Sequence, residues 1–337
     1  MNLVGQIVNG PKSLHVMNND YQNFITAAEW KDATLTPISQ DASNRHYFRV
    51  ANTENTVILM DAKREATHSF DAFINVSKNL RSIGLSAPDI YSIDRLNKFM
   101  LIEDLGKKTF ADDLNDNPEL EFERYQAAIS MIVELQHAPT FGLQHANTTD
   151  LVNMLAPFFE IPEIVTTDNF WNSEVFNEVF RAFESALIHR PVLSLRDCHV
   201  ENLIWMPNRV GVKRVGILDF QDAFLCDPCY DLVSLLWDVR RDLDATTRNR
   251  LISFYANKKN MDVAELMPRI NVLKFQRNLR ILGIFDRLIN SGKHKYSKFV
   301  PRTLEYVNEA LDTSECSTLQ PYLRKYITPL ITKYGCA

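Results

Sequence analysis

Three residues in the second half of the chain have the types and spacing that could support phosphoryl transfer. Asp197 and Asn202 lie in the stretch SLRDCHVENLI, and Asp219 follows a short apolar run. Phosphoryl transfer needs a carboxylate to orient the attacking hydroxyl and oxygen ligands to hold Mg²⁺ on the phosphates. We therefore expect Asp197 to be the catalytic carboxylate, with Asn202 and Asp219 as metal ligands.

A purely structural reading of the same residues is also possible, because Asp and Asn often cap turns and strand ends. The features around them favour chemistry. The spacing Asp-x-x-x-x-Asn, a later apolar run ending in Asp-Phe, and a β-rich first third followed by a helical remainder occur in one chain. Three independent features would have to coincide by chance for the structural reading to hold.

The first hundred residues are expected to be mainly strands. β-favourable runs cover 34–40, 45–51, 56–61, 89–94 and 98–103, with a turn at 52–55 and helices near 19–30 and 67–83. From about residue 118 the pattern becomes helical, over 119–137, 149–159, 170–189, 228–243, 245–257, 263–290, 302–312 and 317–332. Short β-favourable pieces at 192–195, 202–206 and 213–219 interrupt it.

The polar segment 105–116 is the natural joint between these two regions. The prediction is an α+β fold in two lobes. A small lobe with a mixed β-sheet, 1–104, would bind nucleotide. A larger, mainly helical lobe, 105–337, would hold the catalytic and substrate-binding residues.

Composition excludes several classes of protein. The chain has 337 residues, 45% hydrophobic and 23% charged, with a formal net charge of −5, so it lacks the broad basic footprint of a nucleic-acid-binding protein. No stretch of about 18 apolar residues free of charges predicts a membrane span, and the N-terminus makes a poor signal peptide. Five scattered cysteines indicate reduced thiols, and the pair Cys226-x-x-Cys229 has no second pair that would complete a zinc site. We expect a cytoplasmic enzyme. Its oligomeric state is not specified.

The loop around Asp197 resembles that of the aminoglycoside-phosphotransferase-like branch of the protein-kinase fold. More narrowly, the chain is similar to bacterial kinases that phosphorylate N-acetylmuramate and N-acetylglucosamine at the anomeric hydroxyl during peptidoglycan recycling. Four blocks carry this resemblance: residues 41–50 (DASNRHYFRV), 59–62 (LMDA), 218–223 (LDFQDA) and 276–288 (QRNLRILGIFDRL), the last continued by 292–293 and 301–302. The resemblance implies ATP and Mg²⁺ as cofactors and a small-molecule sugar as substrate.

The resemblance also assigns the nucleotide contacts. Ser43, Asn44 and Arg45 would contact the phosphates, in a loop that has no glycine between Pro37 and Val50. The backbone from Glu103 to Leu105 would hydrogen-bond adenine.

Two further departures from the general kinase pattern concern single positions. The usual strand lysine is absent, and Met60 lies near its position. Leu195 stands where a histidine usually precedes the catalytic loop. His199 and Asp231 would have structural roles, Asp231 as the brace of that loop.

The acceptor pocket is assigned to the arginine-rich helix. N-acetylmuramate carries a carboxylate, and guanidinium groups suit carboxylates by bidentate geometry. Arg277 or Arg280 is therefore expected to help form the sugar pocket. Two alternatives stay open: a kinase for another small alcohol such as an aminoglycoside or choline, and a nucleotide-binding pseudokinase scaffold. The arginines disfavour a cationic acceptor, and the retained Asp197, Asn202 and Asp219 disfavour a scaffold.

Overall fold

The computed structural model describes residues 19–38, 45–162, 164, 174–188 and 190–334. Contacts within the chain group it into two compact units, Met1–Phe70 with Asp89–Asp104, and Asp71–Pro88 with Leu105–Ala337. Each unit is described by itself below. The division of the chain at 104/105 into a nucleotide-binding and a catalytic lobe stays a prediction.

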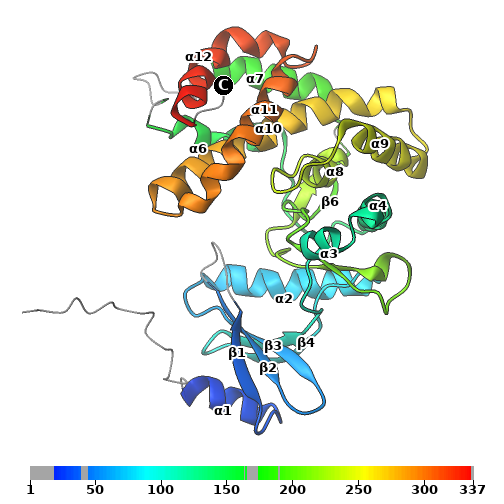
Figure 1. Ribbon diagram of the computed structural model, residues 1–337, viewed down its shortest axis with the longest axis vertical. Coiled ribbons are helices and arrows are strands. Elements are labelled where there is room, and N and C mark those ends of the chain that lie inside the picture. The colour runs from blue at the N-terminus through cyan, green and yellow to red at the C-terminus, as the bar shows by residue number, and fades with distance from the viewer. Residues whose placement is uncertain (1–18, 39–44, 163, 165–173, 189, 335–337) are drawn as a thin grey trace, which may run out of the picture. The chain divides into compact units, whose positions relative to one another are not determined.

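The first unit is built on a five-stranded sheet (Figure 1). Its strands are β1 (Thr34–Ile38), β2 (His46–Ala51), β3 (Thr56–Asp61), β4 (Ile90–Asp94) and β5 (Phe99–Glu103), in the order β1-β2-β3-β5-β4. Every neighbouring pair is antiparallel, which corrects the expectation of a mixed sheet. Short connections join β2 to β3 and β4 to β5, and such connections reverse the chain rather than carry it across to a parallel neighbour.

The turn between β2 and β3 follows from one asparagine. Asn52 Oδ1 accepts hydrogen bonds from the backbone N–H groups of Glu54, at 3.0 Å, and Asn55, at 2.8 Å. Asparagine side chains favour such turns because they can replace a backbone acceptor. The turn predicted at 52–55 is confirmed.

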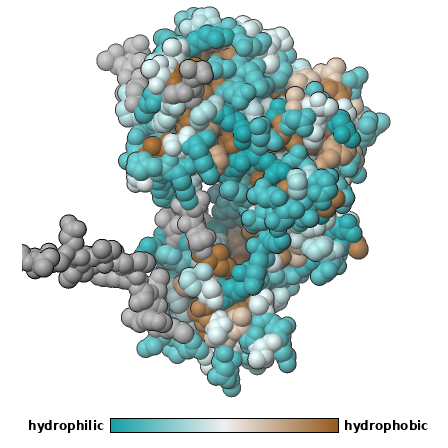
Figure 2. Space-filling model, viewed as in Figure 1, coloured by the Kyte–Doolittle hydropathy of each residue, from teal (hydrophilic) through white to brown (hydrophobic). Residues whose placement is uncertain are grey.

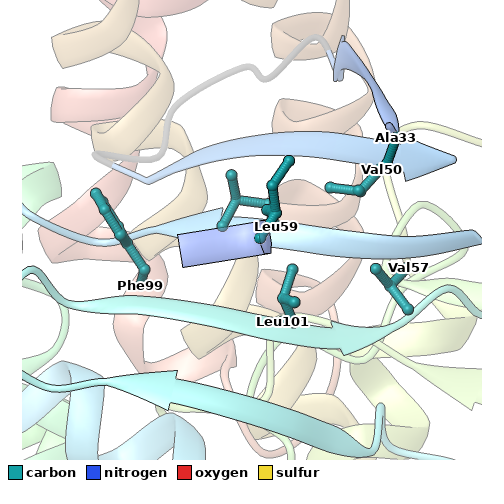
Figure 3. Packing of buried hydrophobic residues seen from close by; sticks show 7 residues of the cluster. Ala33, Val50, Val57, Leu59, Phe99 and Leu101 are labelled. Atoms are coloured by element: carbon teal, nitrogen blue, oxygen red, sulfur yellow. The ribbon is translucent and has the colours of Figure 1, made fainter. Parts of the chain in front are cut away.

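One face of the sheet packs on helix α1 (Asn19–Ala27). Val57 and Leu59 of β3 and Phe99 and Leu101 of β5 are buried on this face (Figure 3), together with Ile25 of α1. Each strand contributes alternate residues because successive side chains point to opposite faces. This core fixes the register of β3 and β5, since a slip of one residue would turn every member away from α1 to the opposite face of the sheet.

The second unit is mainly helical. Helix α2 (Thr67–Ser82) extends from the first unit into it. The other helices are α3 (Phe110–Asp116), α4 (Glu121–Leu135), α5 (Thr148–Asn153), α6 (Ala156–Phe159), α7 (Glu174–Ala186), α8 (Cys229–Leu236), α9 (Ala245–Lys259), α10 (Val263–Asn290), α11 (Val300–Leu311) and α12 (Gln320–Tyr334). Short 3₁₀ segments lie at η1 (Pro118–Leu120), η3 (Gly211–Arg214), η4 (His294–Phe299) and η5 (Ser317–Leu319). In the view of Figure 2, hydrophilic residues cover most of the surface of this unit.

Helix α10 is the central element of the second unit. It packs against α6, α8 and α11, and most of its residues from Arg269 to Asp286 are buried. Gly283 permits the close approach to α6, because a Cβ there would clash with the backbone of Pro157 and Phe158. The helix predicted at 263–290 is confirmed at both ends.

Three predicted segments differ from the structure. Residues 105–116 contain α3, whose first turn is capped by Thr109 through a capping box with Asp112. The helix expected at 149–159 is split into α5 and α6, with a proline in the first turn of α6. The helix expected at 228–243 ends at Leu236, and Asp238 beyond it accepts a hydrogen bond from the distant Val200 N–H instead.

Two short strand pairs also belong to this unit. Strand β6 (Val192–Ser194) pairs with β9 (Phe224–Cys226), and β7 (Leu203–Trp205) pairs with β8 (Val215–Ile217), both antiparallel. Strand β9 was not predicted, although the equally short β6, β7 and β8 lie within predicted β-favourable runs. Among the described helices, none has the length and apolar character needed to cross a membrane.

Candidate active site

The loop between β6 and β7 holds Asp197 and Asn202 in one compact turn. Asn202 Nδ2 donates to the Asp197 carbonyl at 3.0 Å, and the Asn202 N–H donates to the His199 carbonyl at 2.9 Å. The spacing Asp-x-x-x-x-Asn therefore closes a hydrogen-bonded loop. The Asp197 side chain keeps 38% of its surface exposed, so a ligand can reach it.

Asp219 is brought beside this loop by strand pairing. Strand β8 pairs with β7 through Leu203 and Ile217, and the next backbone group, Leu218 N–H, donates to the Asn202 carbonyl at 2.9 Å. Asp219 follows with φ 53°, in the left-handed region that non-glycine residues rarely occupy. One of its carboxylate oxygens accepts a hydrogen bond from Gln221 Nε2 at 2.9 Å.

Asn202 and Asp219 have a donor set that fits Mg²⁺. The Asn202 amide nitrogen is engaged by the Asp197 carbonyl, which leaves its amide oxygen as the atom that could ligate a metal. Asp219 is an exposed carboxylate. Within the described ranges no cluster of three or more His, Cys, Asp or Glu residues could hold a metal ion. Mg²⁺ needs no such cluster, because it is commonly bound by one or two protein oxygens together with water and substrate phosphates.

Asp231 of α8 braces the start of the loop. Its carboxylate accepts hydrogen bonds from Ser194 Oγ at 2.8 Å and from the backbone N–H groups of Leu195 at 2.7 Å and Arg196 at 3.1 Å. Burial raises the pKa of Asp231 to about 6, although these hydrogen bonds act in the opposite direction. Leu195, at the position where the general kinase pattern has histidine, is buried, and its backbone N–H takes part in this brace.

Arg277 of α10 lies against the candidate catalytic residue. Its Nη1 donates to the Arg196 carbonyl at 2.6 Å, its Nη2 is 3.7 Å from Asp197 Oδ1, and its guanidinium lies over the Tyr230 ring at 4.8 Å. Burial alone would raise the pKa of Asp197, but the nearby guanidinium groups of Arg277 and Arg280 outweigh it and lower that pKa. Asp197 is therefore held as a carboxylate.

His199 and Glu201 of the same loop are placed for structural roles. His199 is buried, and burial lowers its pKa to about 4, so its imidazole is neutral near pH 7. Glu201 pairs with Arg240 at 2.9 Å. Arg240 also pairs with the buried Asp238, which accepts the Val200 N–H at 3.3 Å.

The residues expected to contact nucleotide are spread over the chain. Ser43 and Asn44 lie outside the described residues. Arg45 is buried in the first unit, where its Nε donates to Glu65 at 2.8 Å and its Nη2 to Ser69 at 3.2 Å. A phosphate contact by Arg45 stays a prediction, and any such contact would compete with this ion pair.

The expected adenine-binding segment belongs to both units. The Glu103 N–H donates to the Asp89 carbonyl at 2.8 Å within the first unit. Leu105 opens the second unit and is buried. Met60, near the position of the missing lysine, is fully buried in β3. The role of Glu103 and Leu105 also stays a prediction.

Comparison with known proteins decides the family. The model of the phosphotransferase enzyme family matches residues 34–267, more than half of the chain. The chain belongs to that family. An N-acetylmuramate/N-acetylglucosamine kinase of Caulobacter vibrioides is 28% identical to this phosphotransferase over 347 residues, which cover 90% of this chain and 95% of the relative.

Solved structures of low sequence identity show the fold. A choline/ethanolamine kinase family protein of Mesorhizobium loti has a TM-score of 0.62 at 13% identity, covering 91% of this chain and 98% of that one. The streptomycin–ATP–APH(2")-IIa ternary complex has a TM-score of 0.57 at 14% identity, covering 90% and 98%. The phosphotransferase therefore has the predicted α+β, protein-kinase-like fold, with an N-terminal sheet and a mainly helical remainder.

The second unit of this phosphotransferase brings five of the expected residues together: Asp197, Asn202, Asp219, Arg277 and Arg280. Sequence reasoning missed Arg196 as a functional candidate. Its charge and its place next to Asp197 could have marked Arg196 as a candidate. What distinguishes it in the structure is its positive φ and the hydrogen bonds of its backbone to Asp231 of α8 and Arg277 of α10. The assembled groups can orient a hydroxyl at Asp197, hold a divalent cation beside it and attract an anion.

Proposed function

We propose that the protein is an ATP- and Mg²⁺-dependent sugar kinase that phosphorylates the anomeric hydroxyl of N-acetylmuramate and N-acetylglucosamine. The observation that carries this proposal is the likeness to an N-acetylmuramate/N-acetylglucosamine kinase along 95% of that relative's length. The grouping of Asp197, Asn202 and Asp219 supports it, because these are the groups that transfer to a hydroxyl requires.

In this proposal Asp197 orients the sugar hydroxyl and accepts its proton as the bond to phosphorus forms. Its lowered pKa keeps it unprotonated, as a proton acceptor must be. Asn202 and Asp219 would hold Mg²⁺, which when bound supplies neutralisation of the phosphate charge. The hydrogen bonds from Asn202 to the Asp197 carbonyl and from Leu218 to Asn202 would keep base and metal ligands in register.

The remaining assignments complete the substrate sites. Ser43, Asn44 and Arg45 would contact the ATP phosphates, and the backbone of Glu103 and Leu105 would contact adenine. Arg277 and Arg280 would border the acceptor pocket. Since ATP is a cytoplasmic metabolite, the enzyme would act in the cytoplasm, on amino sugars released during peptidoglycan recycling.

A cationic acceptor such as choline or an aminoglycoside is disfavoured by charge. Arg277 and Arg280 are both close enough to Asp197 to lower its pKa, and Arg196 acts in the same direction. An ammonium group in this pocket would meet guanidinium groups, and like charges in a partly buried site repel strongly. The low-identity likeness to a choline kinase family protein concerns the fold.

The test is ADP release from MgATP with N-acetylmuramate, N-acetylglucosamine, choline and an aminoglycoside as acceptors. We expect turnover with the two acetylated sugars and a loss of about 100- to 10,000-fold in kcat for Asp197→Asn, the range found for general-base catalysis. Asp312→Asn is the matched control, because Asp312 is exposed and pairs with Arg324 on the surface. Phosphorus NMR of the product would identify the anomeric phosphate. Turnover restricted to choline or the aminoglycoside would refute the proposal.

A further inference from the structure

Two guanidinium groups beside Asp197 have no hydrogen-bond acceptor among the described residues. Arg196 and Arg280 both act electrostatically on Asp197, and Arg196 also acts on Arg280. In the part of the chain that the structure describes, no hydrogen bond or ion pair joins the side chain of Arg196 or Arg280 to another residue. Arg196 Nε is buried without a partner, and its guanidinium lies 6.0 Å from the centre of the Phe224 ring.

The backbone of Arg196 is held in a conformation that arginine rarely adopts. Its φ is 74°, in the left-handed region that favours glycine. Two other elements hold it there: Asp231 of α8 accepts its N–H at 3.1 Å, and Arg277 of α10 donates to its carbonyl at 2.6 Å. Such strain persists where the surroundings over-determine it, and it points to a functional demand on the side chain.

Arg277 and Arg280 of α10 have different tasks. They are three positions apart and therefore lie on the same side of the helix. Arg277 is buried, pairs with Asp197, donates a hydrogen bond to the Arg196 carbonyl and lies over the Tyr230 ring. Arg280 is partly exposed and makes none of these contacts among the described residues. Arg277 is thus a positioning residue, and Arg280 is the one that can turn to a ligand.

Tyr230 helps to keep Arg277 in place, because its ring is fully buried against that guanidinium. Buried donors in native proteins are nearly always satisfied, and unpaired ones ask for an explanation. Among the described residues Arg196 Nε is such a donor. An oxyanion that accepts from Arg196 and Arg280 would satisfy both guanidinium groups.

We propose that Arg196 and Arg280 form a clamp that binds the carboxylate of an acidic acceptor while Asp197 receives its hydroxyl. This inference rests on the proposed sugar-kinase function and deepens it, because it names the part of the acceptor that is recognised. N-acetylmuramate has such a carboxylate and N-acetylglucosamine does not. The clamp therefore sets the preference between the two sugars and leaves the phosphoryl transfer step to Asp197 and the metal ligands.

The experiment compares kcat/KM for the two sugars in Arg280→Met, Arg196→Gly and the control Arg287→Met. Arg287 is on the same helix, but it is exposed and pairs with Glu160. A charge-assisted hydrogen bond corresponds to a factor of about 10 to 100. We expect each of the first two variants to lose at least about tenfold more kcat/KM for N-acetylmuramate than for N-acetylglucosamine. Glycine accepts a φ of 74°, so Arg196→Gly should keep the melting temperature of the unmodified chain.

Equal losses of kcat/KM for both sugars would overturn the clamp, because they would assign the arginines a role at the transferred phosphoryl group or in the structure of the loop. No loss of kcat/KM for either sugar would overturn it as well. If the unmodified chain phosphorylates neither sugar, the proposed function fails instead. Calorimetric binding of N-acetylmuramate then tests the clamp alone: weaker binding in Arg280→Met than in Arg287→Met supports it, and equal binding overturns it.

Discussion

The buried ion pair between Asp227 and Arg269 offers the sharpest test of how the site is supported. Arg269 Nη2 is 3.0 Å from Asp227 Oδ1 and its Nε is 3.1 Å from Oδ2, with 3% and 2% of the arginine and aspartate side chains exposed. Asp227 also accepts the backbone N–H of Cys229 at 2.8 Å, at the start of α8. Because α8 carries the Asp231 brace, this pair joins the long helix α10 to the candidate catalytic loop.

Replacing Arg269 by methionine removes the charge and keeps most of the apolar volume. The Asp227 carboxylate would stay buried, with the backbone N–H groups of Cys229 and Ile188 as its main remaining donors. Breaking a buried pair in this way costs about 3–5 kcal/mol. Since native domains have about 5–15 kcal/mol of stability in total, we expect Arg269→Met to lose a large fraction of it.

The matched control is Arg287→Met on the same helix. The Arg287–Glu160 pair has a distance of 2.5 Å but leaves 63% and 61% of the two side chains exposed. Exposed pairs contribute about 0–1 kcal/mol, so this variant should be nearly neutral. Urea unfolding followed by circular dichroism would measure both free energies of unfolding. Equal effects in the two variants would refute the reasoning, because burial would then not decide the cost.

A second-site change separates the charge from the packing. In the Arg269→Met background, Asp227→Asn removes the stranded charge and keeps an oxygen that can accept the Cys229 N–H. We expect the double variant to be more stable than Arg269→Met alone, as in a coupled pair. Failure of this rescue would assign the loss to packing.

Three further predictions concern stability, pH and metal. Gly283→Ala should destabilise the protein by about 1–3 kcal/mol although alanine is the better helix former, because its Cβ would clash with the α6 backbone; an increase in melting temperature would contradict this. Burial raises the pKa of Asp231 from its ordinary value of 3.8 to about 6, so it binds more protons in the native state between these values, and its contribution to stability should fall by about 3 kcal/mol as pH rises through that window. Unfolding curves at pH 4 and 7 for the wild type and Asp231→Asn would measure this, and identical pH slopes would contradict it. Asp219→Asn should raise the Mg²⁺ concentration needed for half-maximal turnover, because it removes a charged ligand; an unchanged Mg²⁺ titration would exclude Asp219 from the metal site.

Local sequence signals determined a large part of the secondary structure. Helix α10 was predicted at 263–290 and has those bounds, because its apolar residues repeat at helical spacing over many turns. The hairpin at 52–55 was predicted because Asn52 carries its own acceptor for the turn. The short elements α3 and β9 escaped prediction, and β9 is a strand through its pairing with the distant β6.

The candidate site also has a part that the sequence predicted and a part that only the tertiary structure decided. The residue types and spacing of Asp197, Asn202 and Asp219 were enough to predict a phosphoryl-transfer site, since that chemistry needs a carboxylate and oxygen ligands for a metal close together in space. The sequence could not separate the task of Arg277 from that of Arg280. Only the tertiary structure joins Arg277 to the Arg196 carbonyl, 81 positions away, and leaves Arg280 without a partner among the described residues. Such contacts depend on how α8 and α10 pack on the loop, and no local propensity encodes them.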